Sequence, residues 1–390
     1  MEPLFSDGNG GLMPTYGRFP VELDHGRGAV VVDTQGREYI DFGSGIGVNA
    51  LGYCEPGWVK AVTEQAGRLQ HVSNLYDNPV QAAFARELCA AAGMARVFLC
   101  NSGAEANECA IKLARKYSFD RYGEGRSTVL TLQNSFHGRT VTTLAATGQD
   151  DFHRYFYPFT GGFRYLPAND LAAVEQAMDG TVCAVMLECV QGEGGVLPLD
   201  FDYLRGVREL CTARDVLLLI DEVQTGAGRT GRFLACEHAP IRPDVVTLAK
   251  GLGGGLPIGA CLCAEAFGDV LSSGTHGSTF GGNPVVCAAG RYMLSRLTDP
   301  AFLQEVAEKG AYLRARLQTM PHVTEVQGLG MMLGAALDAA DAKEVAARCV
   351  RNGLLVLTAK ARLRFLPPLN ITREDMDRGL ERLEAVLTAL

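Results

Sequence analysis

Short apolar runs alternate with longer amphipathic stretches from about residue 60 onward. Most of the runs are continuously apolar, which is typical of strands that are covered on both faces of a sheet. Because helical stretches separate them, the pattern predicts the βα repeats of a mainly parallel sheet. The predicted strands lie at residues 97–100, 128–132, 182–188, 216–220, 245–249 and 259–263.

The two ends of the chain follow other patterns. Residues 1–20 are rich in Gly and Pro, and we expect them to form an arm that lies on another surface. Two apolar runs, 29–33 and 38–42, flank a short polar turn sequence, which predicts a β-hairpin. Beyond about residue 285 we expect helices at 290–297, 301–318 and 373–389 and short strands at 323–327, 332–337, 354–357 and 362–366.

These patterns predict an α/β protein with two domains. The large domain is built on a mainly parallel, mixed central sheet, and the smaller domain is α+β. We place an N-terminal arm and hairpin at residues 1–55, as part of the small domain, the large domain at 56–285, and the C-terminal small domain at 286–390.

Composition narrows the range of functions. The 390 residues carry a net charge of −8 and contain no basic run, so nucleic acid is not an expected partner. No apolar segment is long enough to cross a membrane, and the first residues lack the pattern of a signal peptide, so we expect a cytoplasmic protein. The twelve cysteines are scattered through apolar stretches without a CxxC pair. That pattern favours buried free thiols over disulfides or a zinc site, and we expect no metal.

Residues with chemical potential follow the predicted strands, and ligands of an open α/β sheet bind beyond the carboxyl ends of its strands. Ser102 follows the first strand, and Glu105 three residues later completes a capping box. The N–H groups of that helix end can hold a phosphate. A well-capped helix without a ligand explains the same residues.

Two further strand ends carry charged residues. Asp221 follows an apolar run, and a carboxylate beside a pyridine nitrogen keeps that nitrogen protonated. A carboxylate that caps the next helix, or one that pairs with Arg229, also explains Asp221 without a ligand. Lys250 stands before four glycines in five residues, which let backbone approach a ligand and suit a lysine nucleophile. A flexible loop with an incidental lysine remains the alternative.

Two more motifs are less specific. Phe136 can stack on a flat ring and Arg139 can hold a carboxylate, although the motif alone favours a core phenylalanine and a surface arginine. For His137 we expect a hydrogen-bonded structural role instead of catalysis. Ser278 and Thr279, in a Gly-rich turn, form either a second phosphate contact or a tight turn between domains.

The ordered set of motifs resembles the class III (ω-amino) aminotransferases, in the branch around N-acetylornithine aminotransferase, from about Gly17 to the C-terminus. The resemblance implies a fold-type I pyridoxal-phosphate transferase whose large domain binds the cofactor. It also implies that Lys250 carries the cofactor as a Schiff base, that Asp221 pairs with the pyridine nitrogen and that Phe136 stacks on the ring. The other implied cofactor contacts are Ser102, Gly103, Ala104, Val223, Gln224 and Thr279.

The same resemblance implies how substrates are held. Arg139 would bind a substrate carboxylate far from the reacting amine, and Arg364 the α-carboxylate of glutamate or 2-oxoglutarate. Glu193 would pair with Arg364 while an amine donor is bound, and Ser278 would be a further substrate contact. Thr279 would reach the cofactor phosphate of a neighbouring subunit, which implies a homodimer with shared active sites.

The expected reaction moves the ω-amino group of N-acetylornithine to 2-oxoglutarate, giving N-acetylglutamate semialdehyde and glutamate in arginine biosynthesis. Succinylornithine, N-succinyl-diaminopimelate, ornithine and γ-aminobutyrate remain alternative donors, and a mutase or racemase of the same fold remains open. From other classes, a nucleotide-binding protein lacks its phosphate motif here, and an inactive scaffold does not need these residues together. The chain departs from the family at Tyr53 and Glu55, where relatives usually have histidines.

Overall fold

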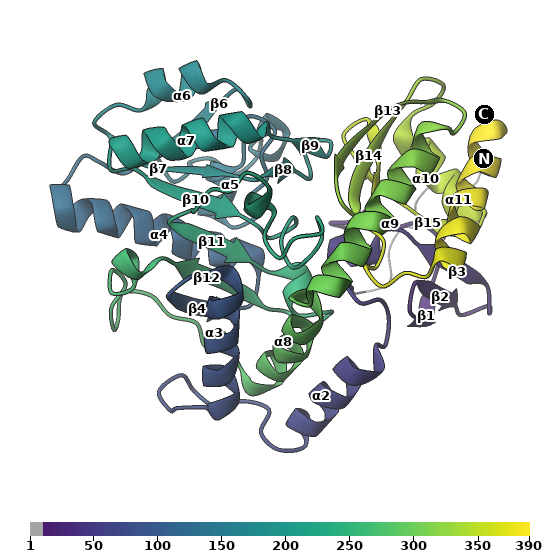
Figure 1. Ribbon diagram of the computed structural model, residues 1–390, viewed down its shortest axis with the longest axis horizontal. Coiled ribbons are helices and arrows are strands. Elements are labelled where there is room, and N and C mark those ends of the chain that lie inside the picture. The colour runs from purple at the N-terminus through teal and green to yellow at the C-terminus, as the bar shows by residue number, and fades with distance from the viewer. Residues whose placement is uncertain (1–10) are drawn as a thin grey trace.

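The computed structural model describes residues 11–390, so half of the predicted N-terminal arm, residues 1–10, lies outside the described residues. A seven-stranded sheet forms the centre of the larger lobe (Figure 1). β12 runs antiparallel to both of its neighbours, and the other pairings are parallel, so the sheet is mixed as predicted. Its strands are, in order, β4 (Arg96–Cys100), β12 (Gly259–Cys263), β11 (Val245–Leu248), β10 (Leu217–Asp221), β7 (Val182–Leu187), β5 (Thr128–Leu132) and β6 (Phe163–Leu166).

Both faces of this sheet are covered, which explains its continuously apolar strands. In β10, Leu217 and Leu219 pack in one cluster with residues of α4 (Gly103–Tyr122). Leu218 and Ile220 point to the other face and pack with residues of α7 (Phe201–Ala213). Successive side chains of a strand alternate between its faces, so a strand between two helical layers needs apolar residues at every position.

The second lobe holds two smaller sheets beside three helices (Figure 1). One sheet joins β1 (Leu23–Arg27), β2 (Val30–Asp33), β3 (Glu38–Asp41) and β15 (Leu354–Leu355), and the other joins β13 (Val323–Leu329), β14 (Met332–Leu337), β17 (Arg362–Phe365) and β16 (Leu357–Ala359). The predicted hairpin is therefore present as β2 and β3, and β3 pairs with β15 from the far end of the chain.

The remaining elements connect or cover these sheets. The first helices and short strands are α1 (Ser44–Gly47), α2 (Pro56–Ala66), α3 (Pro79–Ala92), α5 (Val141–Ala146), α6 (Leu171–Ala177), β8 (Val190–Gln191) and β9 (Leu197–Pro198). The later helices are α8 (Pro284–Leu297), α9 (Pro300–Gln318), α10 (Ala342–Arg351) and α11 (Arg373–Thr388). Short 3-10 turns lie at Asp150–Phe152, Ala235–His238, Lys250–Leu252 and Glu265–Phe267. The expected domain boundary at residue 286 falls inside the first turn of α8.

The observed elements differ from the predicted ones in several places. The edge strands β1 and β6 were missed. α8 begins six residues earlier than the predicted start at residue 290, because Asn283 caps it and Pro284 suits the first helical position. The single strand expected at 354–357 is two strands, since β15 pairs with β3 whereas β16 pairs with β17.

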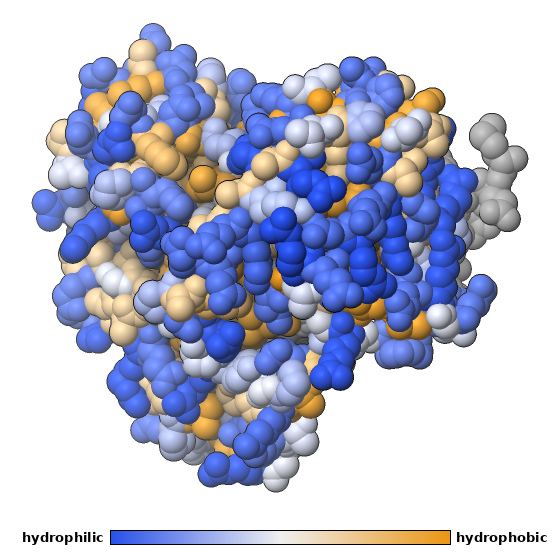
Figure 2. Space-filling model, turned by 45° about the vertical axis from the view of Figure 1, so that its right-hand side comes forward, coloured by the Kyte–Doolittle hydropathy of each residue, from blue (hydrophilic) through white to orange (hydrophobic). Residues whose placement is uncertain are grey.

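The face of the molecule in Figure 2 is mostly hydrophilic, with apolar side chains in small separate groups. Within residues 11–390, no helix combines the length and apolar character that crossing a membrane requires.

Candidate active site

Five strands of the central sheet end at the same edge, because β4, β5, β7, β10 and β11 all run in one direction. At or just after those ends stand, in the same order, Ser102, Phe136, Glu188, Asp221 and Lys250. The sheet therefore brings residues separated by almost 150 positions to one edge.

The N-terminus of α4 is the place where the sequence predicts a phosphate cradle. Ser102 is its N-cap, as predicted, and its hydroxyl accepts a hydrogen bond from the Glu105 N–H at 3.1 Å. The Glu105 carboxylate accepts from the N–H of Asn101 at 2.9 Å, one residue before the usual capping-box donor. A Cβ on Gly103 would lie 2.6 Å from Cγ1 of Val223, so only glycine fits there. The first-turn N–H groups of this 20-residue helix have no partners within the helix.

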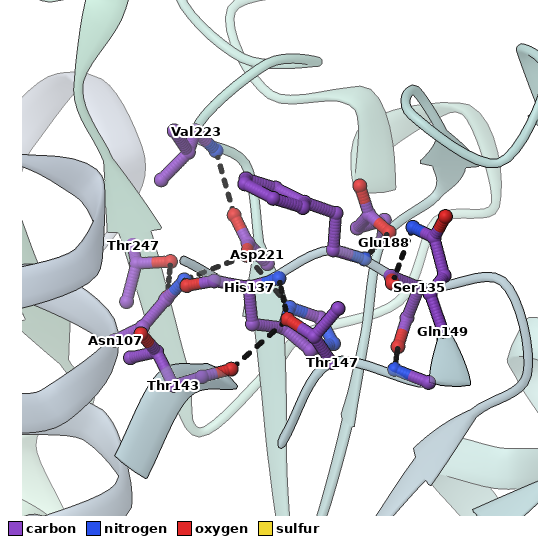
Figure 3. Close-up of polar contacts among 12 residues, drawn as sticks. Asn107, Ser135, His137, Thr143, Thr147, Gln149, Glu188, Asp221, Val223 and Thr247 are labelled. Atoms are coloured by element: carbon purple, nitrogen blue, oxygen red, sulfur yellow. Dashed lines mark hydrogen bonds and ion pairs between the residues drawn. The ribbon is translucent and has the colours of Figure 1, made fainter. Parts of the chain in front are cut away.

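Asp221 is 4% exposed and stands at the centre of a buried polar network (Figure 3). Its carboxylate accepts hydrogen bonds from Asn107 Nδ2 at 2.8 Å, from the N–H of Val223 at 3.0 Å and from His137 Nδ1 at 2.8 Å. Asn107 is itself held, because its Oδ1 accepts from the Thr247 hydroxyl at 2.7 Å. Four separate segments of the chain thus fix the position of one carboxylate.

His137 is buried, and its bond to Asp221 gives it the hydrogen-bonded role that the sequence predicts. Its Nε2 has no hydrogen-bond partner within residues 11–390. The alternative partner proposed for Asp221 was wrong, since Arg229 lies elsewhere and donates to the carbonyls of Met331 and Pro367.

Glu188 was not singled out from the sequence, although it ends β7 at the same edge of the sheet. It is buried and accepts a hydrogen bond from the N–H of Phe136 at 3.1 Å. Burial, and next the charge of Asp221, raise the pKa of Glu188 well above its ordinary value. The rule that ligands bind at strand ends could have found it, but the predicted strand 182–188 counted it as a strand residue.

Lys250 begins a short turn after β11, with a positive φ of 46° that is strained for a lysine. Its ammonium makes no hydrogen bond or ion pair within the described part of the chain. Burial lowers the pKa of Lys250, and Arg364 acts in the same direction, whereas the carboxylates of Glu193, Asp221 and Glu188 oppose the shift. A lysine with a lowered pKa loses its proton more readily and so becomes a nucleophile or base.

Arg364, on β17, forms an ion pair with Glu193 near this lysine. Its Nη1 lies 2.5 Å from Glu193 Oε1 and 3.2 Å from Gln224 Oε1, and Gln224 Nε2 donates to Glu193 at 3.4 Å. The Arg364 side chain is only 4% exposed, against 25% for Glu193. Burial alone would raise the pKa of Glu193, but Arg364 outweighs it and the pKa is lowered. The Nε of Arg364 is buried and has no partner among residues 11–390.

Three predicted residues stand apart from this cluster. Arg139 is exposed, with its guanidinium 5.6 Å from the ring of Phe136 and 4.1 Å from the ring of Phe152, and it makes no ion pair within the described residues. Ser278 accepts a hydrogen bond from Asn101 Nδ2 at 3.1 Å, beside the cradle. Thr279 is exposed and is not brought to the cluster within this chain.

Tyr53 and Glu55, where the chain departs from its family, take part in other contacts. The Tyr53 hydroxyl donates to Asp41 at 2.7 Å, and the Tyr292 hydroxyl donates to Glu55 at 2.7 Å. Neither contact involves a predicted cofactor residue.

The residues present fit pyridoxal phosphate. A phosphate matches the free N–H groups at the start of α4, where a side chain on Gly103 has no room. Asp221 offers a buried carboxylate for a ring nitrogen, Phe136 a ring for stacking and Lys250 an amine with a lowered pKa.

Comparisons with known proteins agree with this arrangement. The family profile described as Aminotransferase class-III matches residues 13–387. The acetylornithine aminotransferase of Haemophilus ducreyi is 52% identical over 97% of each chain. The crystal structure of N-acetylornithine aminotransferase from Stenotrophomonas maltophilia has a TM-score of 0.84 at 41% identity and covers 95% of this chain and 96% of that one. The crystal structure of ornithine aminotransferase from Toxoplasma gondii has a TM-score of 0.93 at 36% identity and covers 97% of this chain and 93% of that one. The chain belongs to the class-III aminotransferases, which use pyridoxal phosphate and share the fold-type I architecture.

Proposed function

We propose that this enzyme transfers the ω-amino group of N-acetylornithine to 2-oxoglutarate, giving N-acetylglutamate semialdehyde and glutamate in arginine biosynthesis. The observation that carries the proposal is the Glu193–Arg364 ion pair beside Lys250. The relatives described above, which bear the name acetylornithine aminotransferase over nearly the full length, support the choice of donor.

The two arginines divide the recognition of the substrates. An amine donor places its carboxylate on exposed Arg139, which has no competing acid among the described residues, while Glu193 neutralises Arg364. Leaving a buried arginine without a partner costs about 3–5 kcal/mol, so the pair stays closed until another carboxylate replaces Glu193. The α-carboxylate of 2-oxoglutarate is such a group, and the free Nε of Arg364 gives it a second hydrogen-bond donor. One site then serves two substrates of different shape.

Lys250 is the proposed catalytic base and acid. Pyridoxal phosphate, when bound, supplies an electrophilic carbon and a protonated ring that accepts electrons. The lowered pKa of Lys250 lets its Nζ take a proton from Cδ of N-acetylornithine and later return one. Asp221 holds the charge that keeps the ring nitrogen protonated, Phe136 orients the ring, and Ser102, Gly103 and Ala104 hold the phosphate. Val223 and Gln224 complete the proposed cofactor contacts.

An absorbance spectrum of the purified enzyme tests the donor and the lysine together. N-Acetylornithine, added without an oxo acid, is expected to bleach the yellow band of the bound cofactor. A K250A variant is expected to lose turnover by several orders of magnitude, and full turnover in that variant would contradict the role of Lys250. A yellow enzyme that ignores N-acetylornithine but responds to ornithine, succinylornithine, N-succinyl-diaminopimelate or γ-aminobutyrate would replace the donor and keep the chemistry.

We also propose a homodimer with shared active sites, in the cytoplasm. Three observations support the dimer: exposed Thr279 lies outside the cluster of its own chain, its neighbour Phe280 is 62% exposed, and Met13 of the N-terminal arm is 81% exposed. The twelve free cysteines favour a reducing compartment.

Mixing two inactive variants tests the shared sites. A hybrid dimer of K250A and T279A subunits has one site that carries both defects and one that carries neither. We expect the mixture to regain activity that neither variant has alone. No recovery, in a mixture shown to contain hybrid dimers, would mean that each subunit works with its own residues.

A further inference from the structure

A group of thiols lies outside the site described above. All twelve cysteines are free and ten of them are buried. Three of them, Cys109 on α4 and Cys261 and Cys263 on β12, line a cavity of about 220 Å³. Exposed Arg96 and Ser272 also line this cavity, so it reaches the surface of the chain. A small molecule can therefore approach thiols that are themselves buried.

Cys109 and Cys261 lie next to each other in this lining, close enough that each thiol shifts the pKa of the other. Their proximity follows from the packing of α4 on β12, where both residues belong to one buried cluster. Cys261 is a fully enclosed strand residue in register with Phe98 of β4 on one side and Thr247 of β11 on the other. Two neighbouring thiols on well-packed elements are placed for reaction with each other.

His276 lies next to this pair, and Lys112 adds positive charge there. The ring of His276 packs on Phe98 with centroids 4.6 Å apart, and its Nδ1 lies 2.9 Å from the Lys112 ammonium. Because an ammonium can only donate, Nδ1 of His276 accepts in this contact. The ring of His276 also interacts with the thiol of Cys109.

The two thiols differ in acidity as a result. A hydrogen bond with Cys261, and then a hydrogen bond with His276 and the charge of Lys112, lower the pKa of Cys109 against the opposing effect of burial. The pKa of Cys261 is raised well above its ordinary value by the bond to Cys109 and by burial. The other titratable side chains in the packing around Cys109 include Cys263, Cys100, Arg96, Cys183 and Tyr117, while β10 and β11 contribute only apolar side chains to the cluster.

We propose that Cys109 is a nucleophilic thiol that reacts with small hydroperoxides entering this cavity, and that Cys261 converts the product into an intramolecular disulfide. In the first step the Cys109 sulfur attacks the peroxide, an S–O bond forms, the O–O bond breaks, and the leaving oxygen takes a proton from solvent. Sulfur is oxidised by two electrons and the hydroperoxide is reduced to water or an alcohol. In the second step the Cys261 sulfur attacks Cys109, the S–S bond forms, the S–O bond breaks, and the hydroxide leaves with the Cys261 proton as water.

Competition with Cys54 in the intact holoenzyme tests the proposal, because Cys54 is the cysteine that the described residues leave exposed. The enzyme is treated with limiting hydrogen peroxide at neutral pH, and each cysteine is followed by peptide mass spectrometry. An ordinary thiol carries only a few per cent thiolate at that pH, so we expect Cys109 to react about tenfold faster than exposed Cys54. The product is a peptide pair that joins Cys109 to Cys261 and has lost two hydrogens.

Variants separate the two roles. C261S is expected to trap Cys109 as a sulfenic acid that dimedone captures, C109S to abolish the cross-link, and K112M to slow oxidation of Cys109 about tenfold while leaving Cys54 unchanged. None of these residues belongs to the proposed cofactor or substrate site. Oxidation of Cys54 before Cys109 would overturn the proposal, as would oxidation of Cys109 in the unmodified enzyme without a bond to Cys261. If a variant does not fold, the competition in the unmodified enzyme decides alone.

Discussion

Two regions of the molecule meet at the end of β10, and each is built around a buried carboxylate. Asp221 is 4% exposed and Glu222 is 1% exposed, yet their surroundings differ. Asp221 faces the cofactor edge and accepts three N–H donors, from Asn107, His137 and Val223. Glu222 faces the core and accepts from the Thr225 hydroxyl and from the Cys236 N–H.

The difference shows that neighbours, not residue type, decide what a buried acid does. Around Asp221 two of the three donors, Asn107 and His137, come from distant segments, and together with the nearby Val223 N–H they fix the carboxylate in one orientation for a ligand. Around Glu222 the partners lie nearby in the chain, and burial raises its pKa to about 7. We therefore assign the Asp221 region to chemistry and the Glu222 region to closing the loop between β10 and the turn at Ala235–His238.

The largest expected effect tests whether charge is needed only in the Asp221 region. In D221N the shape is kept, but the neutral amide no longer stabilises a proton on the ring nitrogen. We expect kcat to fall about a thousandfold, the scale of losing one preorganised electrostatic partner. Steady-state kinetics measures it, with E222Q as the matched control. If D221N stays within tenfold of the parent, or if E222Q loses as much, the two acids are not divided in this way.

The second effect concerns stability and belongs to the Glu222 region. Its pKa rises from 4.5 to about 7 on folding, so the folded state holds this proton more tightly than the unfolded chain does. The resulting stabilisation is complete below pH 4.5 and is lost as pH rises through 7. It amounts to about 3 kcal/mol. Denaturant unfolding at a series of pH values is expected to show this loss in the parent enzyme and not in E222Q. If the free energy of unfolding falls equally with pH in the parent enzyme and in E222Q, the loss does not come from Glu222.

The sequence predicts one region better than the other. Asp221 closes a continuously apolar run, so its place at the strand end could be predicted, and so could Ser102 and Lys250. Glu222 follows in the same motif, and nothing local shows which of two adjacent acids turns to the core. Asn107 lies inside a helix and Thr247 inside a strand, without a motif, so only the packing of α4 on β11 brings them to Asp221.

The fold, too, could be predicted from the sequence only in part. Strands covered on both faces, such as β7, have an unbroken apolar pattern that the sequence displays directly. β6 was missed because it lies at an edge and is only partly buried, with Arg164 and Tyr165 between its apolar ends. The proposed substrate residues Glu193 and Arg364 were predicted from family resemblance, since 171 positions separate them in the sequence.

The third effect measures how much the hydrogen-bond donors around Asp221 contribute to kcat. N107A removes the bond to Asp221 Oδ2 and the bond to the His137 carbonyl. We expect kcat to fall about tenfold with little change in KM, because Asp221 keeps its charge but loses orientation. A positioning role also predicts a shift in the pH titration of the cofactor absorbance. N78A, which removes the buried N-cap of α3, is the control and should lower stability while keeping kcat. A change in KM alone would indicate a different role for Asn107.

The smallest effect lies one bond further from the cofactor, at Thr247. Its hydroxyl donates to Asn107 Oδ1 at 2.7 Å and so decides which way the amide points. T247V keeps the shape but removes that donor, and we expect kcat to fall about threefold, from a loss of about 0.5–1 kcal/mol. T247S retains the hydroxyl and is expected to keep the parent rate, although it loses a buried methyl group and some stability. The pair separates hydrogen bonding from packing, because a packing role would lower the rate in T247S and leave T247V unchanged. The effect should also disappear in the N107A background, since without the amide the Thr247 hydroxyl has nothing to orient.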